Sequence, residues 1–239
     1  MPFENIEILP EEYVFPEPGG GPECIPRILH MVWVGTADMP KYAHENIAKW
    51  RELMPNWDVR LWTNADISEF TEIENKINET EKGVQKADIL RYFVVEKYGG
   101  IYMDADVTPH RSLEPIIAMN RMGVACNDIP FHWAYCWNGF FAFSPHHPCM
   151  KSACEKAKRA IINTEDIHIK TGPKLFGDAL VETCIVKGEH VMLPSKYLCN
   201  TVHNNGGACV GSFQGVRYYK NSCVDERFVT HEYCREWSV

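Results

Sequence analysis

The chain has 239 residues and a net charge of −8, from 24 Lys and Arg against 32 Asp and Glu. Its length is typical of one α/β domain with a large core, and its acidic balance argues against a nucleic-acid-binding protein, which needs a basic face for phosphate. No run of about 18 apolar residues occurs, so the sequence predicts no transmembrane segment.

The first 24 residues are expected to be an irregular lead-in, because prolines and a Gly-Gly-Gly-Pro run interrupt them. The first five carry an acid and no basic residue, unlike the start of a signal peptide. We therefore expect a soluble cytoplasmic protein, with a lumenal setting as the less favoured alternative. Residues 25–239 are expected to form a single domain.

The rest of the chain alternates between strand and helix patterns, which predicts an α/β/α sandwich. The charged stretch 72–82 predicts a mobile connection between two helices. The expected elements, in chain order, are a strand at 28–34, a helix at 40–54, a strand at 59–62, a helix opening at 64–66, a helix at 84–98, a strand at 101–107, and helices at about 147–162 and 174–186.

Two aspartates, Asp104 and Asp106, stand one residue apart at the end of the apolar strand 101–107. In an extended chain alternate side chains share a face, so both carboxylates are expected to face one hard cation, which prefers oxygen ligands. On spacing alone, an exposed loop is the commoner explanation of an Asp-x-Asp pair. The helix that precedes the strand reverses this preference.

That helix, 84–98, carries Asp88 and Arg91 three residues apart on one face, and Gly99 stands where a C-terminal cap is expected. One interpretation of the two charges is a surface ion pair, worth about 0.3 kcal/mol. The other is that the helix holds an acid and a guanidinium beside a metal-bound substrate.

Residues Ala87 to Asp106 match a signature in which Ser or Ala precedes Asp-x-x-Arg-Tyr, followed by Tyr-Gly-Gly-x-Tyr-x-Asp-x-Asp. In this the chain resembles the DXD-containing glycosyltransferases of the GT-A fold, in the family of fungal initiating mannosyltransferases and bacterial capsular-polysaccharide sugar transferases. Ile25 to Gly35 is similar to the opening strand of that family and of the clostridial glucosylating toxins, and Pro55 to Asn64 follows in the same order. The resemblance implies a GT-A nucleotide-diphospho-sugar transferase fold, a Rossmann-like α/β/α sandwich.

The C-terminal half resembles the family more thinly. Asn138 to Pro145 is like a later strand of the family, and Thr171-Gly172-Pro173 matches a short element. His231 to Trp237 resembles the closing segment that completes the metal shell. Here Glu236 stands where the family has Ser, and Glu232 becomes a rival to His231 as a metal ligand.

The resemblance implies transfer of a hexosyl group from a nucleoside-diphosphate sugar to a carbohydrate or glycan acceptor in polysaccharide or glycan synthesis. It also implies a divalent cation, Mn²⁺ with Mg²⁺ as the alternative. The implied roles are Asp104, Asp106 and His231 at the metal, Asp88 at the sugar hydroxyls, Arg91 and Trp237 at the diphosphate, Trp33 stacked on the base, Val32 and Asn64 beside the base or ribose, and Asn138 near the anomeric carbon.

The family resemblance also implies retention of the anomeric configuration, and no carboxylate stands out as a covalent nucleophile. A same-face mechanism is preferred, in which the leaving diphosphate oxygen accepts the proton of the acceptor. The match around Trp33 favours a uridine donor over a guanosine donor, although stacking tolerates either ring. A glycoside hydrolase with paired carboxylates and a non-catalytic sugar-binding module are the alternatives.

Ten cysteines without a Cys-x-x-Cys pair predict free thiols rather than a zinc site. Aromatic residues are dense between Phe131 and Phe143, where packing is favoured over sugar stacking. Residues 203–207 are expected to form a loop near the site that orders over the donor.

Overall fold

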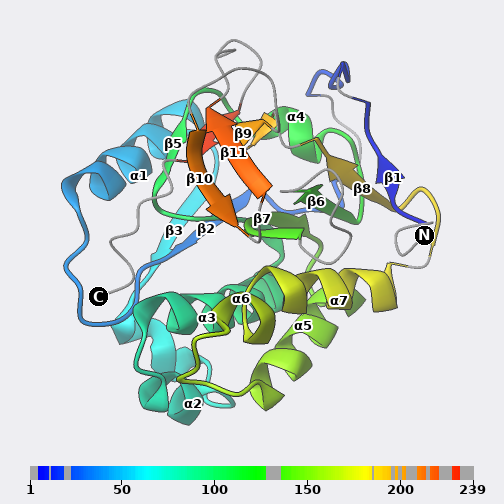
Figure 1. Ribbon diagram of the computed structural model, residues 1–239. Coiled ribbons are helices and arrows are strands. Elements are labelled where there is room, and N and C mark those ends of the chain that lie inside the picture. The colour runs from blue at the N-terminus through cyan, green and yellow to red at the C-terminus, as the bar shows by residue number, and fades with distance from the viewer. Residues whose placement is uncertain are drawn as a thin grey trace.

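The computed structural model describes residues 5–10, 12–18, 23–127, 136–184, 186–194, 197–198, 201–202, 209–213, 216–220 and 228–231. A seven-stranded sheet in the order β1-β8-β6-β7-β4-β2-β3 forms its centre (Figure 1). Its neighbours are parallel except at β7, which runs antiparallel to β4 and β6. The strands are β1 (Glu7–Ile8), β2 (Ile28–Val32), β3 (Asp58–Trp62), β4 (Gly100–Met103), β6 (Gly123–Asn127), β7 (Cys136–Phe143) and β8 (His190–Leu193).

Helices cover both faces of the sheet. On one face α3 (Gly83–Tyr98), α5 (Pro148–Arg159) and α7 (Pro173–Thr183) form a layer, and on the other lie α1 (Lys41–Leu53) and the short α4 (Glu114–Ile117) (Figure 1). Strand residues alternate between the two layers because successive side chains of a strand point to opposite faces. The predicted α/β/α sandwich is therefore confirmed.

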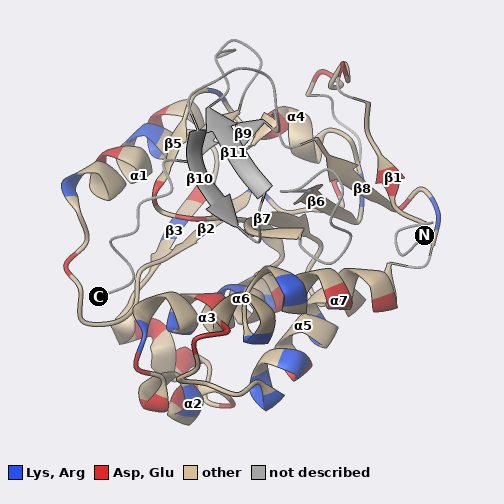
Figure 2. Cartoon of the chain, in the orientation of Figure 1, with Lys and Arg blue, Asp and Glu red and all other residues tan. Residues whose placement is uncertain are grey.

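The two hydrophobic cores show this alternation. Tyr102 and Phe141 pack into the core beneath α3, α5 and α7. Their neighbours Ile101, Met103 and Phe140 pack into the core beneath α1 and α4. Lys, Arg, Asp and Glu positions are frequent along α1, α5 and α7 (Figure 2).

The predicted mobile connection at 72–82 is wrong. Residues Glu74–Glu79 form a short helix, α2, which follows the 3₁₀ helix η1 (Asn64–Glu69). Ile73 and Ile77, four residues apart, are fully buried and dock this helix in the core. Two isolated apolar residues in a charged stretch are too weak a pattern to predict a helix. The short helix α6 (Ile167–Lys170) was not predicted either.

The predicted strand 101–107 is also wrong in its second half. β4 ends at Met103, and the amide of Val107 donates to the carbonyl oxygen of Asp104 at 3.2 Å, which closes a turn around Asp104 and Asp106. The chain then leaves the sheet as β5 (Val107–Pro109) and pairs with β12 (Val229–His231). The two aspartates are thus presented by a turn and not by the pleat of a strand.

Part of the expected lead-in joins the domain. β1 pairs in parallel with β8 at the edge of the central sheet, and the neighbouring Ile6 and Leu9 are buried. The domain boundary at residue 25 stays a prediction. A separate three-stranded sheet contains β9 (Thr201–Val202), β10 (Cys209–Phe213) and β11 (Val216–Lys220).

The described residues also bear on the sequence predictions about membrane-spanning helices and cysteines. The part of the chain that the structure describes contains no helix long and apolar enough to cross a bilayer. The prediction of free thiols is confirmed for Cys24, Cys149, Cys154 and Cys184.

Both ring nitrogens of His30, a residue of β2, make hydrogen bonds. Nε2 lies 2.8 Å from the carbonyl oxygen of Gly99, and Nδ1 lies 3.0 Å from Nε1 of Trp62. An indole N–H only donates, so Nδ1 accepts and the ring proton is on Nε2. Burial lowers the pKa of His30 from 6.5 to about 4, although the Gly99 carbonyl opposes the shift.

We expect His30 to make stability depend on pH. The unfolded chain binds a proton below pH 6.5 and the folded chain only below about 4, so the contribution is complete above pH 6.5 and is lost as the pH falls from 6.5 to about 4. The loss amounts to about 3 kcal/mol at most. Urea unfolding of the wild type and His30→Gln at several pH values checks this. The stability difference between them should shrink on acidification, and a constant difference would contradict the assignment.

Candidate active site

The candidate site lies where the parallel strands β2 and β4 end. The two strands are neighbours, with Leu29 opposite Ile101, so Trp33 and Asp104, which follow them, lie at the same edge of the sheet. Helix α3 contributes Asp88 and Arg91, and β7 contributes Asn138. Open α/β sheets bind ligands at this edge, beyond the carboxyl ends of their parallel strands.

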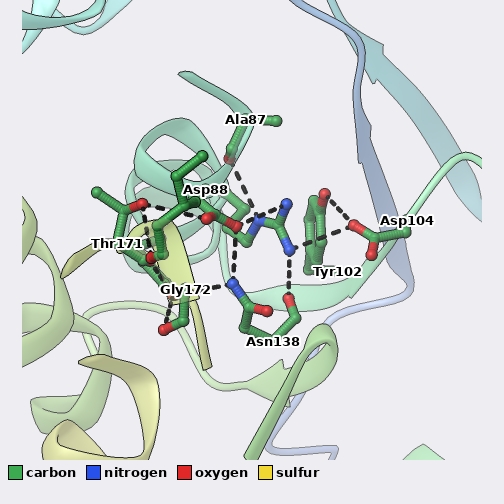
Figure 3. Close-up of polar contacts among 10 residues, drawn as sticks. Ala87, Asp88, Tyr102, Asp104, Asn138, Thr171 and Gly172 are labelled. Atoms are coloured by element: carbon green, nitrogen blue, oxygen red, sulfur yellow. Dashed lines mark hydrogen bonds and ion pairs between the residues drawn. The ribbon is translucent and has the colours of Figure 1, made fainter. Parts of the chain in front are cut away.

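Arg91 contacts four residues that Figure 3 labels, Ala87, Asp88, Asp104 and Asn138. Its Nη2 lies 3.0 Å from Oδ1 of Asp88, and its Nη1 lies 3.2 Å from Oδ1 of Asp104. Nη1 also donates to the carbonyl oxygen of Asn138 at 2.7 Å, and Nε donates to that of Ala87 at 3.2 Å. The planar fork of a guanidinium is suited to this arrangement, which fixes the group in one orientation.

The ionised state of Arg91 is secured by its neighbours. Burial alone lowers the pKa of a guanidinium, but the Tyr102 hydroxyl and the carboxylates of Asp104 and Asp88 raise the pKa of Arg91 above its usual value. The guanidinium carbon also lies 4.7 Å from the centre of the Tyr102 ring, a cation–π contact. Arg91 is therefore a permanent, immobile positive charge at the edge of the sheet.

Asp88 is a buried partner and not a member of a surface ion pair. Its side chain is 6% exposed and that of Arg91 is 5% exposed. Burial raises the pKa of Asp88, while Arg91 and the donors Asn138 and Thr171 lower it. Removing one member of such a buried pair leaves the other charge uncompensated, which destabilises the fold. Each residue therefore stabilises the charged form of the other.

Asp104 reaches further toward solvent, with a side chain that is 20% exposed. The Tyr102 hydroxyl donates to its Oδ1 at 2.8 Å. Gly139 of β7 lies so close that a Cβ there would be 2.3 Å from Oδ2 of Asp104. Only glycine at this position leaves room for the carboxylate where it stands.

The third acid, Asp106, is almost fully buried in the turn between β4 and β5. The backbone of His231 in β12 pairs with Val107, so the chain returns beside the residue that follows Asp106. Among the described residues, no group of three His, Cys, Asp or Glu is assembled as a metal site. The paired carboxylates have the donor chemistry that suits a hard cation, whose remaining positions need oxygens from elsewhere.

The predicted base-binding residues lie at the end of β2. Val32 is buried in the sheet, and the half-buried Trp33 donates from Nε1 to the carbonyl oxygen of Ala37 at 2.9 Å. The Asn64 side chain makes two hydrogen bonds with the backbone of Gly35. Its Oδ1 accepts from the Gly35 amide at 2.9 Å, and its Nδ2 donates to the Gly35 carbonyl oxygen at 2.7 Å. Asn64 therefore holds the loop that follows Trp33, and its contact with a base or ribose stays a prediction.

Asn138 links β7 to α3. Its Nδ2 donates to Oδ1 of Asp88 at 2.8 Å, and Nδ2 also lies 3.3 Å from the Tyr92 hydroxyl. Of the aromatic cluster, Trp137, Phe140 and Phe141 are buried, which confirms packing as their role. Phe131, Trp133, Tyr135, the loop 203–207 and Glu232, Glu236 and Trp237 lie outside the described residues, and so does the side chain of His231.

Sequence reasoning gave no role to Tyr92, Tyr102 and Thr171, which complete the hydrogen bonds of the site. Two of them had a local signal. Tyr92 follows Asp88 by one helical turn, and Tyr102 precedes Asp104 by two residues. Thr171 had none, because it lies 83 residues from its partner Asp88.

Comparisons with known proteins show similarity in the part of the chain that contains Asp88, Arg91, Asp104 and Asp106. Residues 40–122 match a family model described as a glycosyltransferase sugar-binding region containing a DXD motif. The chain is 32% identical over 113 residues to mannosyl phosphorylinositol ceramide synthase SUR1 of Saccharomyces cerevisiae, covering 45% of this chain and 29% of that protein. It is 35% identical over 89 residues to alpha-1,4-N-acetylglucosaminyltransferase of Homo sapiens, covering 36% of this chain and 24% of that protein. The match thus spans less than a third of either relative.

The glycosyltransferase domain from the YGT toxin has a similar fold, with a TM-score of 0.53 over 73% of this chain and 81% of that one, at 10% identity. The resemblance to DXD glycosyltransferases is therefore confirmed, as is the GT-A fold.

Proposed function

We propose that this chain, whose residues 40–122 match the DXD-containing sugar-binding region of glycosyltransferases, transfers a hexosyl group from a nucleoside-diphosphate sugar to a carbohydrate acceptor. The observation that carries the proposal is the guanidinium of Arg91, fixed between Asp88 and Asp104 at the edge where open α/β sheets bind ligands. A UDP-sugar is the favoured donor, and a GDP-sugar is the alternative. Trp33 would stack on the base, with Val32 and Asn64 beside the base or ribose.

The main barrier to such a transfer is the negative charge that develops on the leaving diphosphate. Arg91 is held rigidly by four protein acceptors, so it stabilises that charge without having to reorganise. Asp104 and Asp106, with His231, would hold Mn²⁺ or Mg²⁺, which when bound supplies further charge neutralisation at the diphosphate. Trp237 would close over the same group.

We favour retention of configuration without a covalent intermediate, because of the contacts that Asp88, the acid proposed to bind the sugar, already makes. The Asp88 carboxylate is buried, paired with Arg91, and hydrogen-bonded by Asn138 and Thr171. A carboxylate whose charge is engaged in this way is a poor nucleophile, so we favour a same-face transfer over a covalent glycosyl-enzyme. Asp88 would instead accept hydrogen bonds from hydroxyls of the sugar, and Asn138 would lie near the anomeric carbon.

A donor panel tests the proposed function. Purified protein is incubated with Mn²⁺ and UDP- or GDP-linked glucose, galactose, N-acetylglucosamine and mannose, and release of the nucleoside diphosphate is followed. We expect release from one donor class, accelerated by a saccharide acceptor. Absence of release from every donor, with cleavage of glycosides instead, would establish a hydrolase. Saccharide binding without cleavage of either would establish a binding module.

A further inference from the structure

Two residues that connect α6 to α7, Thr171 and Gly172, enter the site from a distant part of the sequence (Figure 3). Thr171 is fully buried, and its Oγ1 donates to Oδ2 of Asp88 at 3.1 Å. The Tyr92 hydroxyl lies 2.8 Å from the carbonyl oxygen of Thr171 and 3.3 Å from that of Gly172. This connection is therefore tied to α3 by both a side chain and its backbone.

The hydrogen bonds of Asp88 are unequally divided between its two oxygens. Oδ1 receives both Nη2 of Arg91 and Nδ2 of Asn138. Among the described residues, Oδ2 receives only the Thr171 hydroxyl. A carboxylate oxygen accepts about two hydrogen bonds, so Oδ2 keeps one acceptor position for a further donor.

Gly172 packs closely against the same oxygen of Asp88. A Cβ at residue 172 would lie 3.3 Å from Oδ2 of Asp88 and 3.1 Å from the Cα of His168. Any side chain at this residue would therefore stand directly beside the oxygen that still has an acceptor position. Glycine lets the connection pack this closely against the carboxylate without displacing it.

We propose that Thr171 and Gly172 are positioning residues for the sugar of the donor. Thr171 fixes the direction of Oδ2 of Asp88, and Gly172 lets the connection pack against that oxygen without displacing it, so that a sugar hydroxyl can donate to the remaining acceptor position. Asp88 thus recognises the sugar through one oxygen and holds Arg91 through the other. This inference rests on the function proposed above and assigns to these two residues the selection of the donor sugar.

The test compares Thr171→Val, which removes the hydroxyl at nearly constant volume, with Thr171→Ser, which keeps it. Thr80→Val is the matched control, because Thr80 is equally buried and its Oγ1 donates to the Lys76 carbonyl at the end of α2, away from Asp88. KM and kcat are measured for the donor that the panel identifies. The inhibition constant of the corresponding diphosphate, UDP or GDP, is measured in parallel.

We expect Thr171→Val to raise KM for the sugar donor at least about tenfold, the effect of losing one hydrogen bond to a charged group. The inhibition constant of the free diphosphate should stay unchanged, because the diphosphate lacks the sugar. Thr171→Ser should restore most of the donor affinity, and Thr80→Val should behave like the wild type. Gly172→Ala should raise KM for the sugar donor in the same selective way without removing a hydrogen bond.

The outcomes separate the two proposals. A wild-type protein that releases nothing from any donor overturns the proposed function, and this inference with it. An active wild type whose Thr171→Val variant keeps its KM, or loses donor and diphosphate affinity equally, overturns the inference alone. Where Thr171→Val does not fold, an unchanged KM in Gly172→Ala overturns it, and a selective rise supports it.

Discussion

Replacement of Asp106 or Asp104 by Asn is expected to abolish donor turnover while the protein stays folded. The two carboxylates lie in one turn at the edge of the sheet and have the donor chemistry of a hard-cation site, and Asn removes the charge at constant shape. Loss of metal assistance costs several kcal/mol of transition-state stabilisation, which corresponds to a rate decrease of about a thousandfold or more. Release of nucleoside diphosphate with and without Mn²⁺ measures the effect.

The control for this substitution is Asp178→Asn on α7, where the acid is half exposed and pairs with Lys174 on the same helix. It should leave turnover unchanged. Asp104→Asn should also lower the free energy of unfolding, because Asp104 is a partner of the buried Arg91. Arg91 pairs with Asp88 and Asp104, so comparison of the Asp104 and Asp106 variants separates loss of that ion pair from loss of metal. Full activity in EDTA, or in either site variant, would contradict the metal proposal.

The sequence was informative where a pattern is local and periodic. The apolar stripe of residues 84–98 predicted α3, and positive φ at Gly99 matches the predicted cap. The strands predicted at 28–34 and 59–62 are present as Ile28–Val32 and Asp58–Trp62, because short runs rich in apolar residues favour strands. Asp88, Arg91, Asp104 and Asn138 were predicted as site residues, and the structure brings all four into one network.

What the sequence could not predict depends on contacts between distant residues. The turn at Asp104 forms because β5 leaves the sheet and pairs with β12, more than a hundred residues later. Whether Asp88 and Arg91 form a surface pair or a buried one is decided by β7 and by Thr171, neither of which the helix pattern reveals. Local periodicity places side chains on the faces of an element, but only packing decides which polar groups are enclosed.

Replacement of Arg91 by Lys is expected to lower kcat on the order of a hundredfold, the usual effect of removing one preorganised donor from a site of developing charge. Lysine keeps the positive charge but carries it on a single nitrogen, whereas Arg91 uses separate nitrogens for Asp88, Asp104 and Ala87. The ammonium of Lys cannot satisfy all of these acceptors from one point. Steady-state turnover of the donor, together with urea unfolding, measures the catalytic and structural parts of the loss.

Arg27→Lys is the matched control for this change. Arg27 also binds a carboxylate through two nitrogens, with Nε 2.9 Å from Oε1 of Glu114 and Nη2 3.1 Å from Oε2, but it lies outside the site and is 39% exposed. The control tests whether loss of a planar fork anywhere in the protein lowers turnover. If Arg27→Lys keeps its kcat and Arg91→Lys loses it while remaining folded, then the geometry of the guanidinium at Arg91 acts on the diphosphate. Unchanged turnover in a folded Arg91→Lys variant would show instead that Arg91 only holds α3 against β7.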